Sequence, residues 1–292
     1  MIDLHTHSTF SDGTFTPTEL VVEAIKKNIH TLALTDHDTM NGLEEGESAA
    51  FNSGIRFIRG VELSIKSSKG EIHLLGLGIS KEASELEGVL VELREKRWKR
   101  NVLMIEKMNE NGFPTAMEDL AKLAGGDVIG RPHMAAHLVN IKACNTIKLA
   151  FDLYLGKGKI LYMAKEKLEL EPAVQLIRRA GGFPIIAHPL SSQLNWQDLE
   201  EEVEKWKAIG VAGLETVHPS VKQAKSRRLE ELAENNGMIC SGGSDFHGKN
   251  KPKIKMGRAI HGRKIPDSYA NFLGNLPNVP LVPPLNPKTK MY

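Results

Sequence analysis

Short apolar stretches of β type recur along the chain, and nearly every one of them ends in a polar or charged residue. Stretches of this kind, bounded by turn residues, are typical of strands. The pattern predicts seven strands, at Ile2–His5, Thr31–Thr35, Arg56–Ser64, Glu71–Ile79, Phe183–Ala187, Gly213–Val217 and Met238–Ser241.

Between several of these strands, apolar residues recur at helical spacing. Helices are predicted at Thr18–Lys27, Leu199–Lys207 and Lys222–Asn235. Strands that alternate with helices favour a parallel sheet or a barrel of the α/β class. The segment Ser67–Gly70 lies between two strands without a helix, so it predicts a hairpin turn and an antiparallel partner for the third strand.

The middle of the chain, from about Ser84 to Tyr162, has almost no strand pattern. It predicts helices at Leu86–Asn111, Ala116–Ala124, Pro132–Val139 and Thr146–Leu155, with an exposed basic stretch at Arg94–Arg100. We therefore expect two domains, a discontinuous α/β body (1–83 and 163–292) and a helical insertion (84–162). The segment after Arg263 holds six of the 14 prolines and is predicted to be an extended segment packed on the body, or to be partly disordered.

Composition narrows the class of protein. The 292 residues carry a formal charge of only +2, which argues against a protein that binds duplex DNA through bulk charge. No run of about 18 apolar residues predicts a membrane span, and the first residues do not resemble a secretory leader. Two cysteines cannot build a disulfide framework. We expect a cytoplasmic protein whose oligomeric state is open, with a monomer favoured.

Histidines and acids gather where the predicted strands end. A His-x-His pair closes the first strand, and residues i and i+2 of a strand share a face, so both imidazoles can meet one ion. Barrel enzymes place their chemistry at the carboxyl ends of their strands. One histidine after a strand would mean little, but the joint pattern predicts a metal site. The candidate ligands are His5, His7, Asp12, His37, Glu62, His73, His188, Asp245 and His247.

The donor types indicate which ions fit. Several imidazoles without a thiolate favour Mn²⁺, Zn²⁺ or Fe²⁺ over Ca²⁺ and Mg²⁺. The carboxylates would offset the charge of the ions and can bridge them. The nine candidate ligands exceed what one ion needs, so more than one divalent ion is expected, with Mn²⁺ favoured.

These motifs resemble those of the PHP (polymerase and histidinol phosphatase) family. The resemblance rests on His5-x-His7, Asp36-His37, Ala187-His188-Pro189 and Ser244-Asp245-x-His247, and it covers the chain on both sides of the helical middle. It implies a distorted (β/α)7 TIM-like barrel with a helical insertion domain. Many family members have His where Asp12 stands, and Asp there resembles the free-standing phosphoesterase branch. That branch is linked to AMP, to nucleoside 3′,5′-bisphosphates and to 5′→3′ trimming of short RNA.

The resemblance also implies how the ligands divide among three ions. One ion would be held by His5, His7, Glu62 and Asp245. A second would be held by Glu62 as a bridge, His73 and His188. The third would be held by Asp12, His37 and His247.

A candidate phosphate site lies in the helical middle, where Gly130-Arg131-Pro132-His133 opens a helix. The start of a helix offers free N–H groups to an anion, and an arginine can bind phosphate through two parallel hydrogen bonds. The resemblance implies that this string, with Arg131 and His133, binds the phosphate of the substrate. His218 follows the sixth strand at the same end of the barrel. We expect it to contact the phosphate or to protonate the leaving group.

The sequence predicts a metal-dependent phosphoesterase that hydrolyses phosphate monoesters of nucleotides, and also short 5′-phosphorylated oligonucleotides. A hydroxide that bridges two ions would attack phosphorus. An amidohydrolase acting on an amide or lactone remains an alternative, although no strand-end lysine is available to bridge two ions. A non-catalytic accessory module is the other alternative. The complete set of candidate ligands argues against it.

Overall fold

The computed structural model describes residues 1–292 except 52, 68–69, 125–128 and 276–292. Its seven strands form one sheet in chain order, and each lies where the sequence predicts a strand. Their bounds are β1 Ile2–Asp3, β2 Thr31–Leu34, β3 Arg56–Ile65, β4 Ile72–Leu77, β5 Phe183–Ala187, β6 Gly213–Val217 and β7 Ile239–Gly242.

The sheet curls into a nearly closed barrel. All neighbouring strands are parallel except β4, which is antiparallel to both β3 and β5, as the predicted hairpin requires. The two edges meet where the Leu4 N–H donates to the Gly242 carbonyl at 3.3 Å and where Thr6 pairs with Phe246 in a parallel bridge. One buried apolar cluster takes residues from every strand from β1 to β6, as a barrel interior does. The distorted seven-stranded TIM-like barrel is confirmed.

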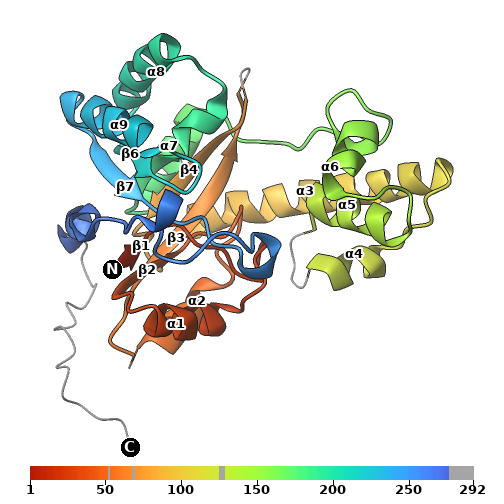
Figure 1. The fold of residues 1–292 in the computed structure, drawn as a ribbon, viewed down its shortest axis with the longest axis horizontal. Coiled ribbons are helices and arrows are strands. Elements are labelled where there is room, and N and C mark those ends of the chain that lie inside the picture. The colour runs from red at the N-terminus through yellow and green to blue at the C-terminus, as the bar shows by residue number, and fades with distance from the viewer. Residues whose placement is uncertain (52, 68–69, 125–128, 276–292) are drawn as a thin grey trace, which may run out of the picture.

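Three predicted helices are confirmed, and they lie on the outside of the barrel (Figure 1). They are α1 Pro17–Lys26, α8 Trp196–Ala208 and α9 Gln223–Asn235. The sequence analysis missed α2 Leu43–Ala50 and α7 Leu170–Arg179. Helix α2 is short and holds Gly46, against whose Cα the Phe57 ring packs so closely that a Cβ would overlap it. Glycine there weakens the helical pattern in the sequence while the packing requires it.

The predicted helical middle forms α3 Ser84–Glu110, α4 Met117–Ala124, α5 Arg131–Asn140 and α6 Ile147–Ala150, which continues into a π-helical turn at Phe151–Leu155. Figure 1 shows α3 extending from the barrel to the group formed by α4, α5 and α6. Leu86 and Leu90 at the start of α3 belong to the core between the barrel and its helices. Met104 and Met108 near its end belong to a separate core with Leu138. The division into two domains at 84 and 162 stays a prediction.

Short 3-10 segments complete the described part of the chain, at Pro189–Ser192, Gly248–Asn250, Ile260–Gly262 and Asp267–Asn275. The last segment corrects the prediction of an extended tail, because Asp267–Asn275 forms 3-10 turns. Leu273 is fully buried against the barrel interior, as the predicted packing on the body requires. The prolines from 277 onward lie outside the described residues. No helix in the described ranges is long and apolar enough to cross a membrane.

Closure of the barrel depends on Gly243, because a Cβ at this position would overlap the Cβ of His5. We predict that Gly243→Ala lowers the free energy of unfolding by about 1–3 kcal/mol, as overpacking at a rigid contact does. Urea unfolding measures the difference. Gly88→Ala is the matched control, since Gly88 lies in α3 with no atom within 4 Å of the added Cβ. It should raise stability by about 0.5–1 kcal/mol. Equal stability of the Gly243→Ala variant and the unmodified protein would contradict the predicted contact.

Candidate active site

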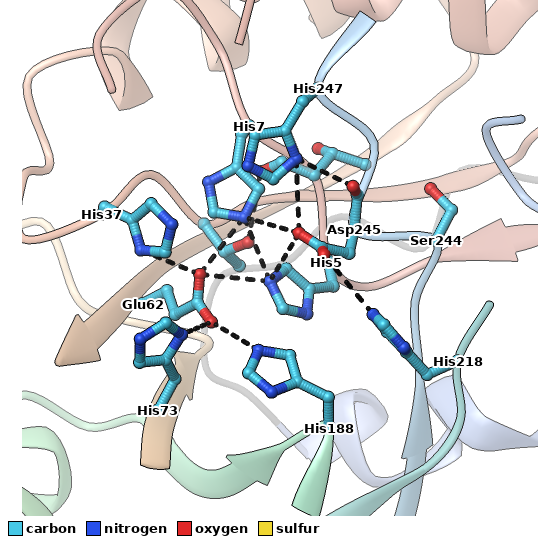
Figure 2. A network of polar contacts seen from close by, with 12 residues as sticks. His5, His7, His37, Glu62, His73, His188, His218, Ser244, Asp245 and His247 are labelled. Carbon is cyan, nitrogen blue, oxygen red and sulfur yellow. Dashed lines mark hydrogen bonds and ion pairs between the residues drawn. The ribbon is translucent and has the colours of Figure 1, made fainter. Parts of the chain in front are cut away.

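All nine predicted ligands meet at one end of the barrel. Figure 2 labels all of them except Asp12. They come from the segments that follow β1, β2, β5 and β7, from the interior of β3 and from the start of β4. Because β4 runs antiparallel, its first residues lie level with the last residues of its neighbours. His73, near the start of β4, therefore reaches the same site as residues that follow the parallel strands.

The carboxylate of Glu62 lies at the centre of the site and is fully buried. Five imidazole nitrogens lie 2.8–3.3 Å from its two oxygens, from His5, His7, His37, His73 and His188. Burial acts to raise the pKa of Glu62, but His37, His5 and His73 together bring it well below the ordinary carboxyl value. Glu62 is therefore ionised, and histidines from several elements of the barrel contact its carboxylate.

Three groups of donor atoms could each hold an ion among the described residues. In the first, Nε2 of His5 and Nε2 of His7 lie 3.1 Å apart, and Asp245 Oδ1 lies 3.7 and 3.4 Å from them. Donors bound at about 2.0–2.2 Å to one ion lie roughly 3–3.5 Å apart. The first group fits that geometry.

The second group surrounds Asp12 and contains His7, His37 and His247. Asp12 Oδ1 lies 3.1 Å from His247 Nε2 and 3.9 Å from His37 Nε2. The predicted third set contained the same residues except His7. His7 directs Nε2 to the first group and Nδ1 to the second, so its ring lies between them.

The third group contains His37, Glu62 and His73, whereas the predicted set placed His188 beside Glu62 and His73. His188 Nε2 still lies 3.2 Å from Glu62 Oε1. His37 Nδ1 and Glu62 Oε2 are 3.0 Å apart, and both are buried without a hydrogen bond among the described residues. Burial lowers the pKa of His37 to about 3, despite Glu62 and Asp12. A neutral imidazole nitrogen and a carboxylate oxygen that lie this close with no proton between them can both bind one divalent ion.

Glu215, inside β6, is a functional residue that the sequence analysis missed. Its carboxylate accepts a hydrogen bond from His5 Nδ1 at 3.0 Å and from the backbone N–H of His188 at 2.8 Å. The bond to Nδ1 fixes the proton of His5 there and leaves Nε2 free to bind a metal. The one available signal was an acid within the apolar stretch Gly213–Val217, where an unpaired charge would be costly.

A cavity of about 350 Å³ opens beside the ligands, and its two walls differ in charge. The barrel wall carries Asp12, His37 and His73. The other wall carries the cations Arg97, Arg100, Arg131 and Lys165, together with His133. The structure thus brings the predicted Arg131 and His133 to the metal ligands.

Two local contacts orient the predicted phosphate-binding residues. The Arg131 guanidinium lies over the Tyr162 ring, 5.2 Å from its centroid. His133 Nδ1 accepts a hydrogen bond from the Gly130 N–H at 3.0 Å, so the ring proton is on Nε2. Burial lowers the pKa of His133, against the effect of Asp12. His133 therefore offers a neutral N–H donor.

His218 lies elsewhere. It is buried and does not belong to the described lining of the cavity. Its Nδ1 accepts a hydrogen bond from the Ser220 N–H at 3.1 Å, and its Nε2 lies 3.5 Å from Asp245 Oδ2. His218 therefore lies beside Oδ2 of Asp245, which is a predicted metal ligand.

The basic stretch 94–100 was predicted to be exposed, which is wrong for Arg97 and Arg100. Each is only 8% exposed, because both lie on the face of α3 that also buries Leu90 and Met104. Arg97 pairs with Asp38, which follows β2. Lys165 Nζ lies 2.6 Å from the same carboxylate. Burial lowers the pKa of Lys165 to about 8, although Asp38 opposes this.

A TIM-like barrel with imidazole and carboxylate donors at the carboxyl ends of its strands defines a class of metal-dependent hydrolases. Residues 3–211 match the family model described as PHP domain, and the chain belongs to that family. It is 37% identical over 245 residues to a 5′-3′ exoribonuclease from Haemophilus influenzae, covering 84% of this chain and 89% of the relative.

Two further comparisons agree. A 3′,5′-nucleoside bisphosphate phosphatase from Chromobacterium violaceum is 35% identical over 247 residues, covering 84% of this chain and 87% of that protein. A solved structure from Bifidobacterium adolescentis, called a metal-dependent phosphoesterase, superposes with a TM-score of 0.80 at 27% identity. It covers 92% of this chain and 94% of its own.

We predict that Glu215→Gln weakens metal binding about 10- to 100-fold, the usual effect of losing a carboxylate that orients a ligand imidazole. Metal affinity can be measured by competition with a coloured chelator. Glu201→Gln is the control, because Glu201 is exposed on α8. Unchanged affinity in Glu215→Gln, with normal folding, would show that the bond to His5 Nδ1 does not control the ligand.

Proposed function

We propose that the protein is a metal-dependent phosphoesterase that hydrolyses phosphate monoesters of nucleotides. AMP, nucleoside 3′,5′-bisphosphates and short 5′-phosphorylated RNA are the candidate substrates. One observation carries the proposal, namely a cavity with candidate metal ligands on one wall and three arginines on the other. Guanidinium groups match the charge and geometry of phosphate, whereas an amide or lactone would leave them unpaired. The relatives named for phosphatase and exoribonuclease activity support the same substrate class.

We propose two to three divalent ions, with Mn²⁺ favoured and Zn²⁺ or Fe²⁺ as alternatives. The donor sets support this choice, because they combine imidazoles with carboxylates and contain no thiolate. The proposed ligands are the nine residues of the sequence analysis, with Glu62 shared between ions. A cytoplasmic location and a monomeric state stay predictions.

Bound divalent ions would supply Lewis-acid stabilisation of the phosphate and make a nucleophile available near neutral pH. The side chains of the chain supply the rest. Arg131 would bind phosphate oxygens that the ions leave free, and His133 would donate from Nε2. His218 would hold Asp245 in place. Its predicted contact with phosphate or the leaving group would require a substrate that extends past Asp245.

A phosphate-release screen tests the proposed function. AMP, adenosine 3′,5′-bisphosphate and 5′-phosphorylated RNAs should be assayed beside amides and lactones, with Mn²⁺, Zn²⁺ or Mg²⁺. We expect turnover of phosphate esters that a strong chelator abolishes and Mn²⁺ restores. Turnover of amides or lactones alone would favour an amidohydrolase. Full activity after complete metal removal would contradict the metal sites, and no turnover with any ion would favour an accessory module.

Arg131→Ala should lower kcat/KM for phosphate esters roughly 10- to 150-fold, which corresponds to about 1.5–3 kcal/mol for a charge-assisted contact to phosphate. Metal content should stay normal, because Arg131 is not a candidate ligand. Arg131→Lys should recover only part of the loss, since an ammonium group lacks the planar fork. Arg227→Ala, an exposed change on α9, is the control. An unchanged kcat/KM in Arg131→Ala would show that the start of α5 is only structural.

A further inference from the structure

A second cavity, of about 250 Å³, lies between α3 and the segment 163–166 that returns to the barrel. Arg97, Arg100 and Lys165 line this cavity as well as the first one. The two cavities therefore adjoin across these three side chains. A ligand that fills the first cavity therefore reaches side chains that also line the second.

The lining of the second cavity is strongly cationic. Five of its ten residues are Lys or Arg and one is Glu, in a chain whose formal charge is only +2. Asp38 pairs with Arg97 and Lys165, and Lys96 Nζ lies 2.9 Å from Glu166. That last pair is exposed and so holds Lys96 only weakly.

Arg100 has no such partner. It is 8% exposed, its one hydrogen bond runs to Asn101 Oδ1 at 2.7 Å, and its buried Nε has no acceptor among the described residues. No carboxylate in the described part of the chain pairs with it. A buried guanidinium without a counter-charge is unfavourable, so its place between two cavities calls for an anionic ligand.

The apolar residues of the lining indicate the kind of anion. Leu93, Leu103, Met163 and Ala164 line the cavity between the cations. Lys96, Lys99 and Leu103 lie on one face of α3, and at 1.5 Å per residue they span about 10 Å. This is the length of roughly three stacked nucleotides. Alternating cationic and apolar contacts fit a single-stranded nucleic acid, which offers both phosphates and base faces.

We propose that the second cavity binds the phosphodiester chain that continues in the 3′ direction from the nucleotide at the metal site. Lys96 and Lys99 bind its phosphates, and Arg100 binds the phosphate that lies between the two cavities. The proposal rests on the proposed function and adds the path that a short RNA takes. A mononucleotide ends before the second cavity, so its hydrolysis does not depend on Lys96 or Lys99.

The test compares substrates of different length in the full-length, Mn²⁺-reconstituted protein. The double variant Lys96→Ala/Lys99→Ala should lower kcat/KM about tenfold or more for a 5′-phosphorylated tetranucleotide. AMP and adenosine 3′,5′-bisphosphate should stay within twofold. Binding of a fluorescent 5′-hydroxyl tetranucleotide, measured without added metal, should weaken in parallel. Its salt dependence, as the slope of log K against log salt concentration, should fall by about 1.4 for two lost phosphate contacts. Lys122→Ala, an exposed change on α4, is the matched control.

Two results would overturn the inference while the proposed function stands. One is an equal loss for mononucleotide and tetranucleotide, and the other is no loss for either. Equally tight binding of an acidic peptide of the same charge would also overturn it, because the cavity would then not select nucleic acid. If the unmodified protein hydrolyses no phosphate ester but still binds the tetranucleotide through Lys96 and Lys99, the proposed function fails separately.

Discussion

Glu62 carries a negative charge at a point of the barrel that solvent does not reach, and the surrounding structure compensates that charge. Five imidazole nitrogens approach its two oxygens, two from the segment after β1 and one each from the loop after β2, from β4 and from the loop after β5. An imidazole must be neutral to bind a metal ion and then does not balance a buried anion, so a ligand set built around Glu62 needs divalent cations to compensate its charge. The antiparallel β4 follows from the same requirement, because a parallel strand there would carry His73 to the opposite end of the barrel.

Other buried carboxylates hold the ligand loops. Asp3 accepts hydrogen bonds from the backbone N–H groups of Ser244 and Gly257 and thereby ties the loop after β7 to β1. Asp36 does the same for the loop after β1 through the Ser8 N–H at 2.7 Å. Asp38, His188 and Asp245 adopt positive φ angles of 54°, 29° and 52°. Such backbone conformations persist only where neighbouring contacts enforce them, and here they lie next to the proposed chemistry.

The sequence analysis predicted what local pattern encodes. Strands show as short apolar stretches, and candidate ligands such as His188 follow them directly, so the barrel and the nine candidate ligands could be predicted in advance. Glu215 left one signal, an acid within an apolar strand. Arg100 left none, because it looks like an ordinary charged residue until α3 is placed against the barrel. The face of α3 is the instructive case. Arg97 and Arg100 occupy buried positions on this face. Because they stand in a run of basic residues, the sequence does not distinguish them from their exposed neighbours. Helix α2 was missed because packing against Phe57 imposes a glycine that helical propensity disfavours.

Helix α3 enters two cores, through Leu90 at one end and Met104 at the other, with both arginines between them. This makes the helix a rigid spacer that sets both the height and the rotation of the helical group over the barrel. Adding one residue between Leu90 and Met104 would turn that group by about 100° around the helix axis. Adding seven would nearly restore the angle but lift the group by about 10 Å. Angle and height cannot both be recovered, so this stretch of the helix should tolerate exchange of its exposed side chains but no change of length.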